Sequence, residues 1–223
     1  MCGRFCFIHT SKVIEERYGI SVPSLFNPTY NAAPAQILPV ISSADRGKLS
    51  FYRWGLELSV PRKDRPAYNN INARAETLEQ KKMFKNLIGR KQCIIPVSGF
   101  YEWKREGRNK RPFLFTTKDE IYSLAGLWDY IPGDDNMGIY CFTIITRPAD
   151  EEVSKLHDRM PLILRPDEEK SWLECEINSK NLLNLGKNIK LESVEVSPEV
   201  NKVANNHPGL IQPYSSPENP TLF

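Results

Sequence analysis

Three observations in the sequence predict a single α+β domain. The chain has 223 residues, of which 40% are hydrophobic and 26% charged, a balance that suits one globular domain with a substantial core. Strand-like segments dominate the stretch from Cys93 to Thr146. Short helical patterns lie on either side of it, so we expect helices at the periphery of a mainly β core.

The first part of the chain combines strands with one helix. Arg4 to His9 alternates in character and predicts a strand, and a helix follows from Ser11, as its N-cap, to Gly19. A loop over 22–34 follows. Two strands come next, at Gln36–Ile41 and Leu49–Trp54, joined by a turn around Asp45-Arg46-Gly47. An exposed loop that contains prolines then extends over 57–70.

Residues 72–77 lead into a predicted amphipathic helix. Its apolar positions keep helical spacing up to Gly89, and they are Leu78, Met83, Phe84, Leu87 and Ile88. The opposite face is rich in lysine.

Two adjacent strands are predicted at 93–96 and 99–104, with a break at Val97-Ser98. Along a strand, Phe100 and Glu102 share one face, while Tyr101 and Trp103 share the other. Glu102 is therefore placed among large apolar neighbours. It is either a solvent-facing edge residue or a partly desolvated acid with a raised pKa.

The second half of the chain alternates strands with short helices. The predicted elements are a basic hairpin tip at Arg105–Arg111, strands at Phe113–Thr117, Ile121–Trp128 and Ile139–Thr146, a turn at 133–136, a short acidic helix at Pro148–Leu156, a strand at Leu162–Leu164, helices at Pro166–Leu173 and Ser179–Leu185, and a closing strand at Leu191–Ser197. Residues 205–223 contain four prolines and predict a loosely packed extended tail.

Composition limits the class of protein. The sequence contains no apolar run long enough for a signal peptide or a membrane span, so we expect a cytosolic protein. Five cysteines without a CxxC pair suit a reducing compartment. Cys2 and Cys6 form a CxxxC pair, but none of the three histidines completes a zinc pattern, so we expect no metal and no cofactor.

The net charge of +3 permits nucleic-acid binding without arguing for it. A basic surface would have to be made locally, and the candidate runs are Lys81-Lys82, Lys85, Arg90-Lys91 and Lys104 to Arg111. Each run is either such a surface or an ordinary solvated helix face or hairpin tip.

Cys2 carries the most distinctive chemistry in the sequence. Removal of Met1 would leave a cysteine whose thiol and free α-amine belong to the same residue. The amine can condense with an aldehyde to give an imine, and the thiol can then close onto the imine carbon to form a thiazolidine ring. The alternative is an ordinary small residue that follows the initiator methionine.

Four other residues are candidates for the same chemistry. His157 precedes Asp158-Arg159-Met160-Pro161 and could shuttle protons, although a lone histidine is more often structural. Asn72 either caps the following helix or holds the α-amine. Arg74 either pairs with an acid such as Glu76 or contacts a phosphate. Glu102 is the candidate acid.

Five ordered blocks of sequence resemble the SOS-response-associated peptidase (SRAP) family. They are Met1-Cys2-Gly3-Arg4; Asn72-Ala73-Arg74-Ala75-Glu76-Thr77; Cys93-Ile94-Ile95-Pro96 with Gly99-Phe100-Tyr101-Glu102-Trp103; Thr146 with Ala149-Asp150; and His157 with Arg159-Met160-Pro161. The resemblance runs from Cys2 to about Asn201, where Ser197 to Asn201 is similar to the family's closing motif.

The resemblance implies a compact fold with an antiparallel, barrel-like sheet, peripheral helices and a basic cleft for single-stranded DNA. It implies that Cys2, once Met1 is removed, crosslinks to the ring-opened aldehyde of an abasic site through a thiazolidine and so shields the lesion. Asn72 would orient the α-amine, Glu102 would act as acid and base, and His157 would help to open the deoxyribose. Glu102 and His157 would also serve the reverse reaction, and a lyase side activity stays open.

The resemblance also implies a set of DNA-binding positions. Phosphates would be held by Arg4, Arg74 and Arg159 with help from Thr146 and Lys82, and the cleft would be lined by Asn31, Pro34 and Trp103. The expected partner is single-stranded DNA that contains abasic sites, bound by a cytoplasmic, nucleoid-associated monomer. Many relatives carry a Trp-containing segment after Trp54-Gly55, and this chain lacks it, so Tyr68 is the candidate for stacking on a base.

Two alternatives to covalent capture of abasic sites remain open at this point. The first, suggested by the family's name, is an autopeptidase or thiol peptidase with Cys2 as nucleophile and His157 as base. The second is a non-covalent reader of modified DNA.

Overall fold

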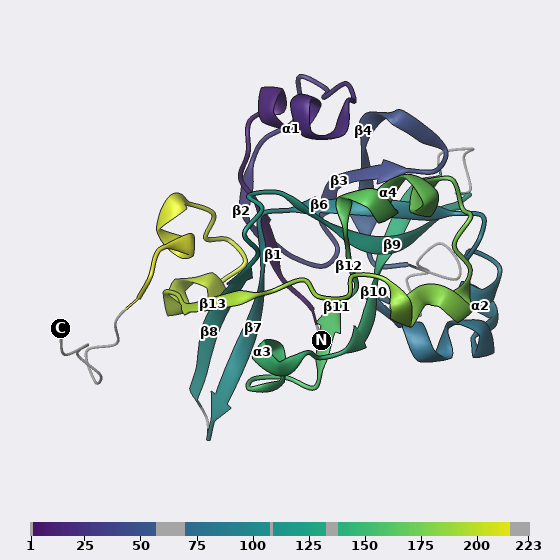
Figure 1. Cartoon of the computed structure of the whole chain (residues 1–223). Helices are drawn as coiled ribbons and strands as arrows, with labels where there is room; N and C mark the ends of the chain where they lie inside the picture. The colour runs from purple at the N-terminus through teal and green to yellow at the C-terminus, as the bar shows by residue number, and fades with distance from the viewer. Residues whose placement is uncertain (1, 57–69, 108, 133–137, 215–223) are drawn as a thin grey trace, which may run out of the picture.

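A closed ring of five strands forms the centre of the structure, a computed structural model that describes residues 2–56, 70–107, 109–132 and 138–214 (Figure 1). Around the ring, each strand pairs with the next and the last returns to the first: β4 (Asp45–Trp54), β3 (Ile37–Ser42), β6 (Gln92–Val97), β9 (Tyr122–Ile131) and β10 (Ile139–Pro148). Three short strands extend it, namely β5 (Asn72–Arg74), β11 (Arg159–Pro161) and β12 (Ile163–Leu164).

A second, five-stranded sheet lies beside the ring. In the order β13-β8-β7-β1-β2, it consists of Glu192–Glu195, Asn109–Thr116, Gly99–Glu106, Phe5–Phe7 and Thr29–Ala32, and all neighbours are antiparallel. The chain passes from ring to sheet at Ser98, whose N–H donates to the Cys6 carbonyl at 2.8 Å. The predicted α+β fold with a barrel-like, mainly antiparallel sheet is confirmed. Two parallel pairings, β4 with β10 and β5 with β10, were not predicted.

One hydrophobic cluster joins the ring to the second sheet. Phe5 and Phe100 from the sheet are fully buried together with Trp54 and Phe142 from the ring. The Phe5 and Trp54 rings lie 5.2 Å apart, and Trp54 stacks on Phe142 at 6.1 Å. Because aromatic side chains bury large areas, this cluster fixes the two sheets relative to each other.

Short helices surround the sheets, as predicted (Figure 1). The α-helices are α1 (Ser11–Tyr18), α2 (Lys82–Lys85), α3 (Glu151–Ser154) and α4 (Pro166–Leu173); the 3-10 helices are η1 (Ala75–Gln80), η2 (Ser179–Asn184), η3 (Pro198–Asn201) and η4 (Pro208–Ile211). Helix α1 ends at Gly19, which adopts a left-handed conformation with φ 66°. Its N-cap is Thr10 rather than Ser11. Among the described residues, no helix has the length and apolar character needed to cross a bilayer.

The amphipathic helix predicted to follow residues 72–77 and to extend to Gly89 is not one continuous helix. The residues before it, Asn72–Arg74, form β5, which pairs in parallel with Ile144–Thr146 of β10. The 3-10 helix η1 follows, and Lys81 then breaks the helical path with an extended backbone at φ −97° and ψ 113°. Leu78, Phe84 and Leu87 are still buried, so the apolar spacing indicated correctly which side chains face the core.

Two other boundaries differ from the prediction. The β3–β4 turn lies at 43–44 rather than around Asp45-Arg46-Gly47, because Asp45 already pairs with Ser42. The tail is packed rather than loose over residues 205–214: Leu210 is fully buried, and the N–H of Tyr214 donates to the Glu195 carbonyl at 2.9 Å. The predicted loop at 57–69 with Tyr68, the turn at 133–136 and the tail beyond Tyr214 lie outside the described residues.

Candidate active site around Cys2

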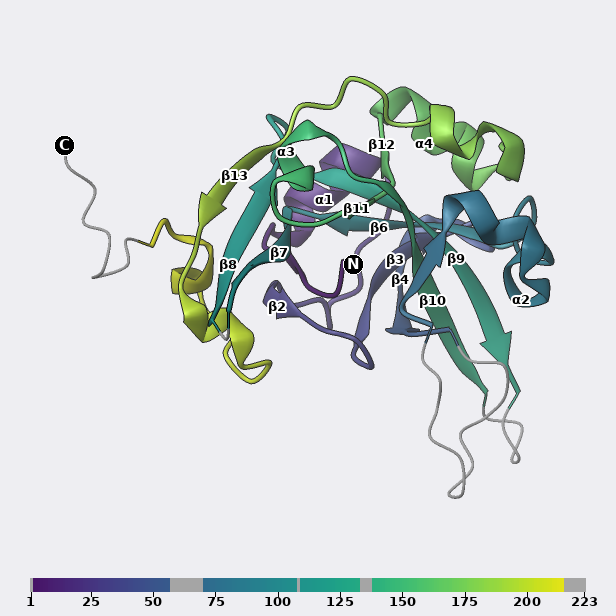
Figure 2. The ribbon, with the colours of Figure 1, turned by 90° about the horizontal axis from the view of Figure 1, so that it is seen from below.

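Cys2 lies just before β1, in the hydrophobic cluster between the ring and the second sheet. Figure 2 shows the start of the chain between β7 and β10. The Cys2 side chain is fully buried. Burial, together with the nearby Glu102 carboxylate, raises the pKa of the Cys2 thiol well above its ordinary value. The thiol is therefore held in its neutral, unreactive form.

Asn72 is positioned against Cys2 by the pairing of β5 with β10. Its Nδ2 donates to the Cys2 carbonyl at 2.8 Å. Its Oδ1 is buried and accepts no hydrogen bond from any residue that the structure describes. The carboxamide therefore holds Cys2 with one end and presents an unused acceptor with the other.

Glu102 points from β7 into the same apolar surroundings and is only 3% exposed. Desolvation raises the pKa of its carboxyl group, and nearby His157 partly opposes that shift. Of the two alternatives open from the sequence, Glu102 is thus the desolvated acid. Its charge raises the pKa of the Cys2 thiol, and His157 in turn acts on the pKa of Glu102.

His157 follows α3, whose first turn is capped by the Asp150 carboxylate through the Val153 N–H at 3.0 Å. The N–H of Arg159 donates to His157 Nδ1 at 3.0 Å, and Oδ1 of Asp158 lies 2.8 Å from the same nitrogen. The first contact suits a ring without a proton on Nδ1, and the second suits a ring with a proton on that nitrogen.

Arg159 and Thr146 form a buried group beside the site. Arg159 is 8% exposed and binds Glu76 through two hydrogen bonds, one of them 2.9 Å between Nη2 and Oε2. Its Nη2 also donates to the Thr146 carbonyl at 2.8 Å. Hydrogen bonding from Arg159 lowers the pKa of Glu76. One of the two alternatives for Arg74 was an ion pair with an acid such as Glu76, and the structure pairs Glu76 with Arg159.

Arg74 is instead exposed on β5, opposite Thr146 in the parallel pairing. It makes no hydrogen bond or ion pair with another residue in the described ranges. Lys82 is also exposed, but it belongs to α2, which stands apart from the start of the chain in Figures 1 and 2. The structure therefore brings Arg74 to the site and does not bring Lys82 there.

Arg4, Asn31 and Trp103 come together at the side of the second sheet. Arg4 Nη1 donates to Asn31 Oδ1 at 2.6 Å, and its guanidinium lies 5.9 Å from the centre of the Trp103 ring. Pro34 is half-buried two residues beyond β2. Backbone carbonyls of the segment after β13 accept from Arg4 and Asn31, and the Asn201 side chain accepts from Trp103. The sequence did not predict these contacts, and the similarity of Ser197–Asn201 to a family motif was its only signal.

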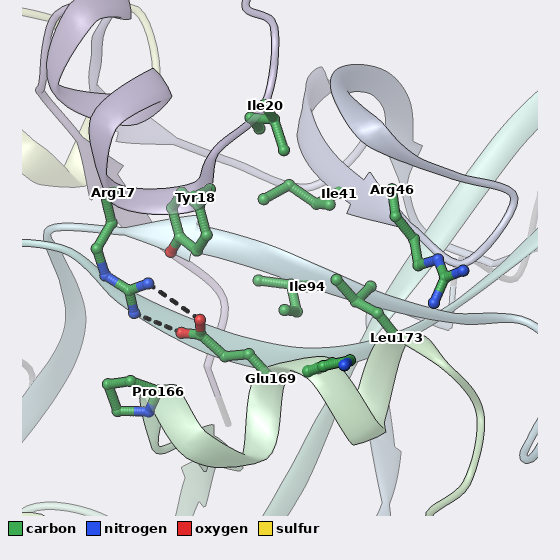
Figure 3. Close-up of a pocket in the computed structure, with 10 residues that line it drawn as sticks. Arg17, Tyr18, Ile20, Ile41, Arg46, Ile94, Pro166, Glu169 and Leu173 are labelled. Atoms are coloured by element: carbon green, nitrogen blue, oxygen red, sulfur yellow. Dashed lines mark hydrogen bonds and ion pairs between the residues drawn. The ribbon is translucent and has the colours of Figure 1, made fainter.

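A separate cavity of about 350 Å³ lies between α1 and α4 (Figure 3). Arg17 and Glu169 form a two-pronged ion pair at its edge, with distances of 3.0 and 2.6 Å, while Ile20, Ile41 and Ile94 supply apolar walls. None of the candidate site residues lines this cavity, so we assign it no part in the chemistry at Cys2.

Known proteins share both the sequence and the fold of this chain. The abasic site processing protein YoqW of Bacillus subtilis is 36% identical over 222 residues, which cover 95% of this chain and 99% of YoqW. The abasic site processing protein HMCES of Gallus gallus is 31% identical over 226 residues, covering 84% of this chain and 67% of that protein. A solved structure of a protein from Bacteroides thetaiotaomicron covers 96% of this chain with a TM-score of 0.85 at 26% identity.

The family model described as SOS response associated peptidase (SRAP) matches residues 1–203, which include both sheets and every candidate site residue. This match confirms the resemblance found in the ordered sequence blocks. The chain therefore belongs to the SRAP family.

Proposed function

We propose that this protein captures abasic sites in single-stranded DNA by a covalent thiazolidine crosslink through Cys2, after removal of Met1. Relatives across most of its length are named abasic site processing proteins. The observation that carries the proposal is the contact between Asn72 and Cys2, with a second, unused Asn72 acceptor beside the residue whose amine would react.

The reaction requires an ordered movement of protons. The Cys2 α-amine adds to the ring-opened aldehyde, and loss of one water gives an imine. The thiol sulfur then bonds to the imine carbon, and the thiol proton ends on the ring nitrogen. Because burial keeps the thiol protonated, its attack follows imine formation instead of preceding it.

The neighbouring groups suit these steps. Asn72 Oδ1 accepts a hydrogen bond from the α-amine and aims its lone pair at the aldehyde. The pKa of Glu102 is raised toward neutral pH, which suits a group that both gives and takes a proton. Glu102 first delivers a proton to the leaving water and then accepts one from the thiol. His157 assists ring opening of the deoxyribose, since both neighbouring contacts engage its Nδ1 and an imidazole can carry a proton between reacting atoms.

The positive side chains around the site give affinity for the DNA backbone. Arg74 is exposed beside Asn72 and is the strongest candidate for a phosphate contact. Arg4 donates to the DNA backbone with those N–H groups that do not bind Asn31. Arg159 can donate to a phosphate only with the N–H groups that are not hydrogen-bonded to Glu76 or Thr146. Such contacts carry no sequence information, so binding is sequence-tolerant.

The high pKa of the Cys2 thiol also bears on the peptidase alternative. A thiol peptidase requires a thiolate, and the buried Cys2 beside a carboxylate disfavours that form. The crosslinking reaction has no such requirement.

The test is a denaturing gel of protein mixed with single-stranded DNA that contains one abasic site. We expect a heat-stable shifted band for the natural protein and none for Cys2→Ala, with intact DNA as the matched control. A natural protein that gives no shifted band, or a Cys2→Ala variant that still gives one, would overturn the proposal. Peptide turnover that persists when the amine is blocked would favour the peptidase instead.

A further inference from the structure

The segment of residues 197–206, here called the C-terminal strap, lies against the outer face of the second sheet. It contains η3, and in Figure 2 it lies beside β7 and β8. Val200 of the strap is buried and packs with Cys6 and Tyr101 of that sheet, and Val196 and Leu210, which lie on either side of the strap, belong to the same cluster. Polar contacts hold the strap as well.

Asn31 is the centre of those polar contacts. Its Nδ2 donates to three carbonyl groups of the strap, at 3.3 Å to Val200, 3.0 Å to Lys202 and 2.8 Å to Asn205. Its Oδ1 accepts from Arg4. Asn31 is 2% exposed, and its amide donors are already shared among the strap carbonyls. Asn31 thus connects Arg4 to the strap.

Arg4 is held at one end only. Nη1 donates to Asn31 Oδ1 at 2.6 Å and to the Val200 carbonyl at 2.7 Å, which uses both of its hydrogens. The Nε–H is buried, and the contacts of Arg4 to other residues in the described part of the chain are made by Nη1. The strap therefore fixes the guanidinium through Nη1 and leaves Nη2 to donate to an anion.

Trp103 is oriented by the strap as well. Its Nε1 donates to Oδ1 of Asn201 at 2.6 Å, and its half-buried ring lies beside the Arg4 guanidinium. An indole held in this way offers a face on which a base can stack, while the neighbouring arginine holds a phosphate. Fixing both side chains in advance reduces the ordering cost of binding.

We infer that the C-terminal strap holds Arg4 and Trp103 in position to bind single-stranded DNA. Within the strap, Asn201 orients the Trp103 indole for stacking on a base. This inference rests on the proposed function, since it assigns a role in binding the same DNA. It concerns non-covalent binding, however, and can therefore be tested without the crosslink.

The experiment measures binding of intact single-stranded DNA to protein carrying Cys2→Ala, in which no crosslink forms. Three of the four tryptophans are buried, at 0% for Trp54 and Trp172 and 8% for Trp128, so quenching of tryptophan emission by DNA reports on Trp103. We expect Asn201→Ala to weaken binding about five- to tenfold and to reduce the quenching at saturation.

Asn206→Ala is the matched control, because Asn206 is also a strap asparagine. Its Oδ1 accepts from the Tyr30 N–H at 2.6 Å, a contact that includes neither Arg4 nor Trp103. We expect this variant to bind within about twofold of the natural protein while losing similar thermal stability, since each change removes one hydrogen bond.

A double-mutant cycle decides whether Asn201 acts through Trp103. Trp103→Phe keeps an aromatic ring and removes the indole N–H, so Asn201→Ala should have no further effect in that background. The inference is overturned if Asn201→Ala and Asn206→Ala weaken binding equally, or if the two changes at 201 and 103 are additive. If Asn201→Ala fails to fold, Trp103→Phe alone tests the inference. Unchanged DNA binding and unchanged quenching in that variant would show that the Trp103 indole takes no part in binding.

The crosslinking assay separates this inference from the proposed function. A natural protein that binds intact DNA through the strap-held residues but forms no crosslink would contradict the function and leave the inference standing. If the crosslink forms, Asn201→Ala should raise the DNA concentration for half-maximal rate and leave the saturated rate unchanged. A lower saturated rate with the same half-maximal concentration would contradict the positioning role.

Discussion

Glu102 and Glu76 are carboxylates whose surroundings move their pKa values in opposite directions. Burial raises the pKa of Glu102, whereas Arg159 lowers the pKa of Glu76. The first shift favours the protonated form of Glu102, and the second favours the charged form of Glu76, which pairs with Arg159. The face of Glu102 was predictable from strand alternation alone. The partner of Glu76 was not, because Arg159 is 83 residues away in the sequence.

The role of Glu102 predicts a difference between two variants in reversal of the crosslink. Glu102→Gln keeps the shape of the side chain but cannot transfer a proton, so release of the DNA should slow at least tenfold. Arg74→Ala should chiefly weaken DNA binding and leave the reversal rate close to natural. Chasing a preformed crosslink with excess abasic DNA measures both rates, and equal reversal in Glu102→Gln and the natural protein would refute the role.

The raised pKa of Glu102 also predicts a pH dependence of stability. A carboxyl group whose folded pKa exceeds its unfolded value, about 4.3, contributes stability that is present below that value and is lost as the pH rises through the folded pKa. Gln does not titrate. The free energy of unfolding of Glu102→Gln, relative to the natural protein, should therefore increase between pH 4 and pH 7 in urea titrations. A difference that does not change with pH would argue against a desolvated Glu102.

Glu76 should behave in the opposite way. Its lowered pKa contributes stability that is present above about pH 4.3 and lost as the pH falls through the folded pKa. Because Glu76→Gln leaves the buried Arg159 without a counter-charge, we expect a loss of about 2 kcal/mol at pH 7 that shrinks under acid conditions. Glu16→Gln, which changes an exposed carboxylate, is the control and should have little effect. An equal loss at pH 3 and pH 7 would contradict the ion pair.

At the scale of elements, predictability followed the range of the interactions. Strands β6 to β10 were predicted because their alternation or continuous apolar character is local to each segment. Strand β5 was missed because only its pairing with β10, about 70 residues later, makes Asn72–Arg74 extended. The strap was missed for the same reason, since its contacts with Arg4 and Asn31 close a loop of almost the whole chain.

The contact between α1 and α4 gives a prediction at this scale (Figure 3). Glu169 of α4 is 8% exposed and accepts hydrogen bonds from Arg17 of α1 and from Ser123 Oγ of β9, the latter at 2.6 Å. These hydrogen bonds connect both helices to β9. Glu169→Gln should lower the free energy of unfolding by about 2–4 kcal/mol, because Arg17 loses its counter-charge. Crosslinking by the folded variant should be unchanged, and a specific loss of crosslinking at full folding would contradict our assignment of this cavity.

At the scale of the molecule, the site exists only where the ring and the second sheet meet. Cys2 and Glu102 belong to the second sheet or the segment before it, whereas Asn72 and His157 belong to β5 and to the connection after β10. No sequence spacing predicts that these four lie in one region, and only the family resemblance grouped them. The proposed mechanism requires the loss of Met1, because Met1 would convert the Cys2 amine into an amide.

The mass of the N-terminal peptide after reaction with abasic DNA tests the central claim most directly. For protein that has lost Met1, we expect the DNA adduct on the peptide that begins at Cys2, with the mass of both components less one water. A variant with one additional residue before Cys2 should give no such adduct. An adduct on that extended variant, or an adduct on a peptide that lacks Cys2, would contradict the thiazolidine mechanism.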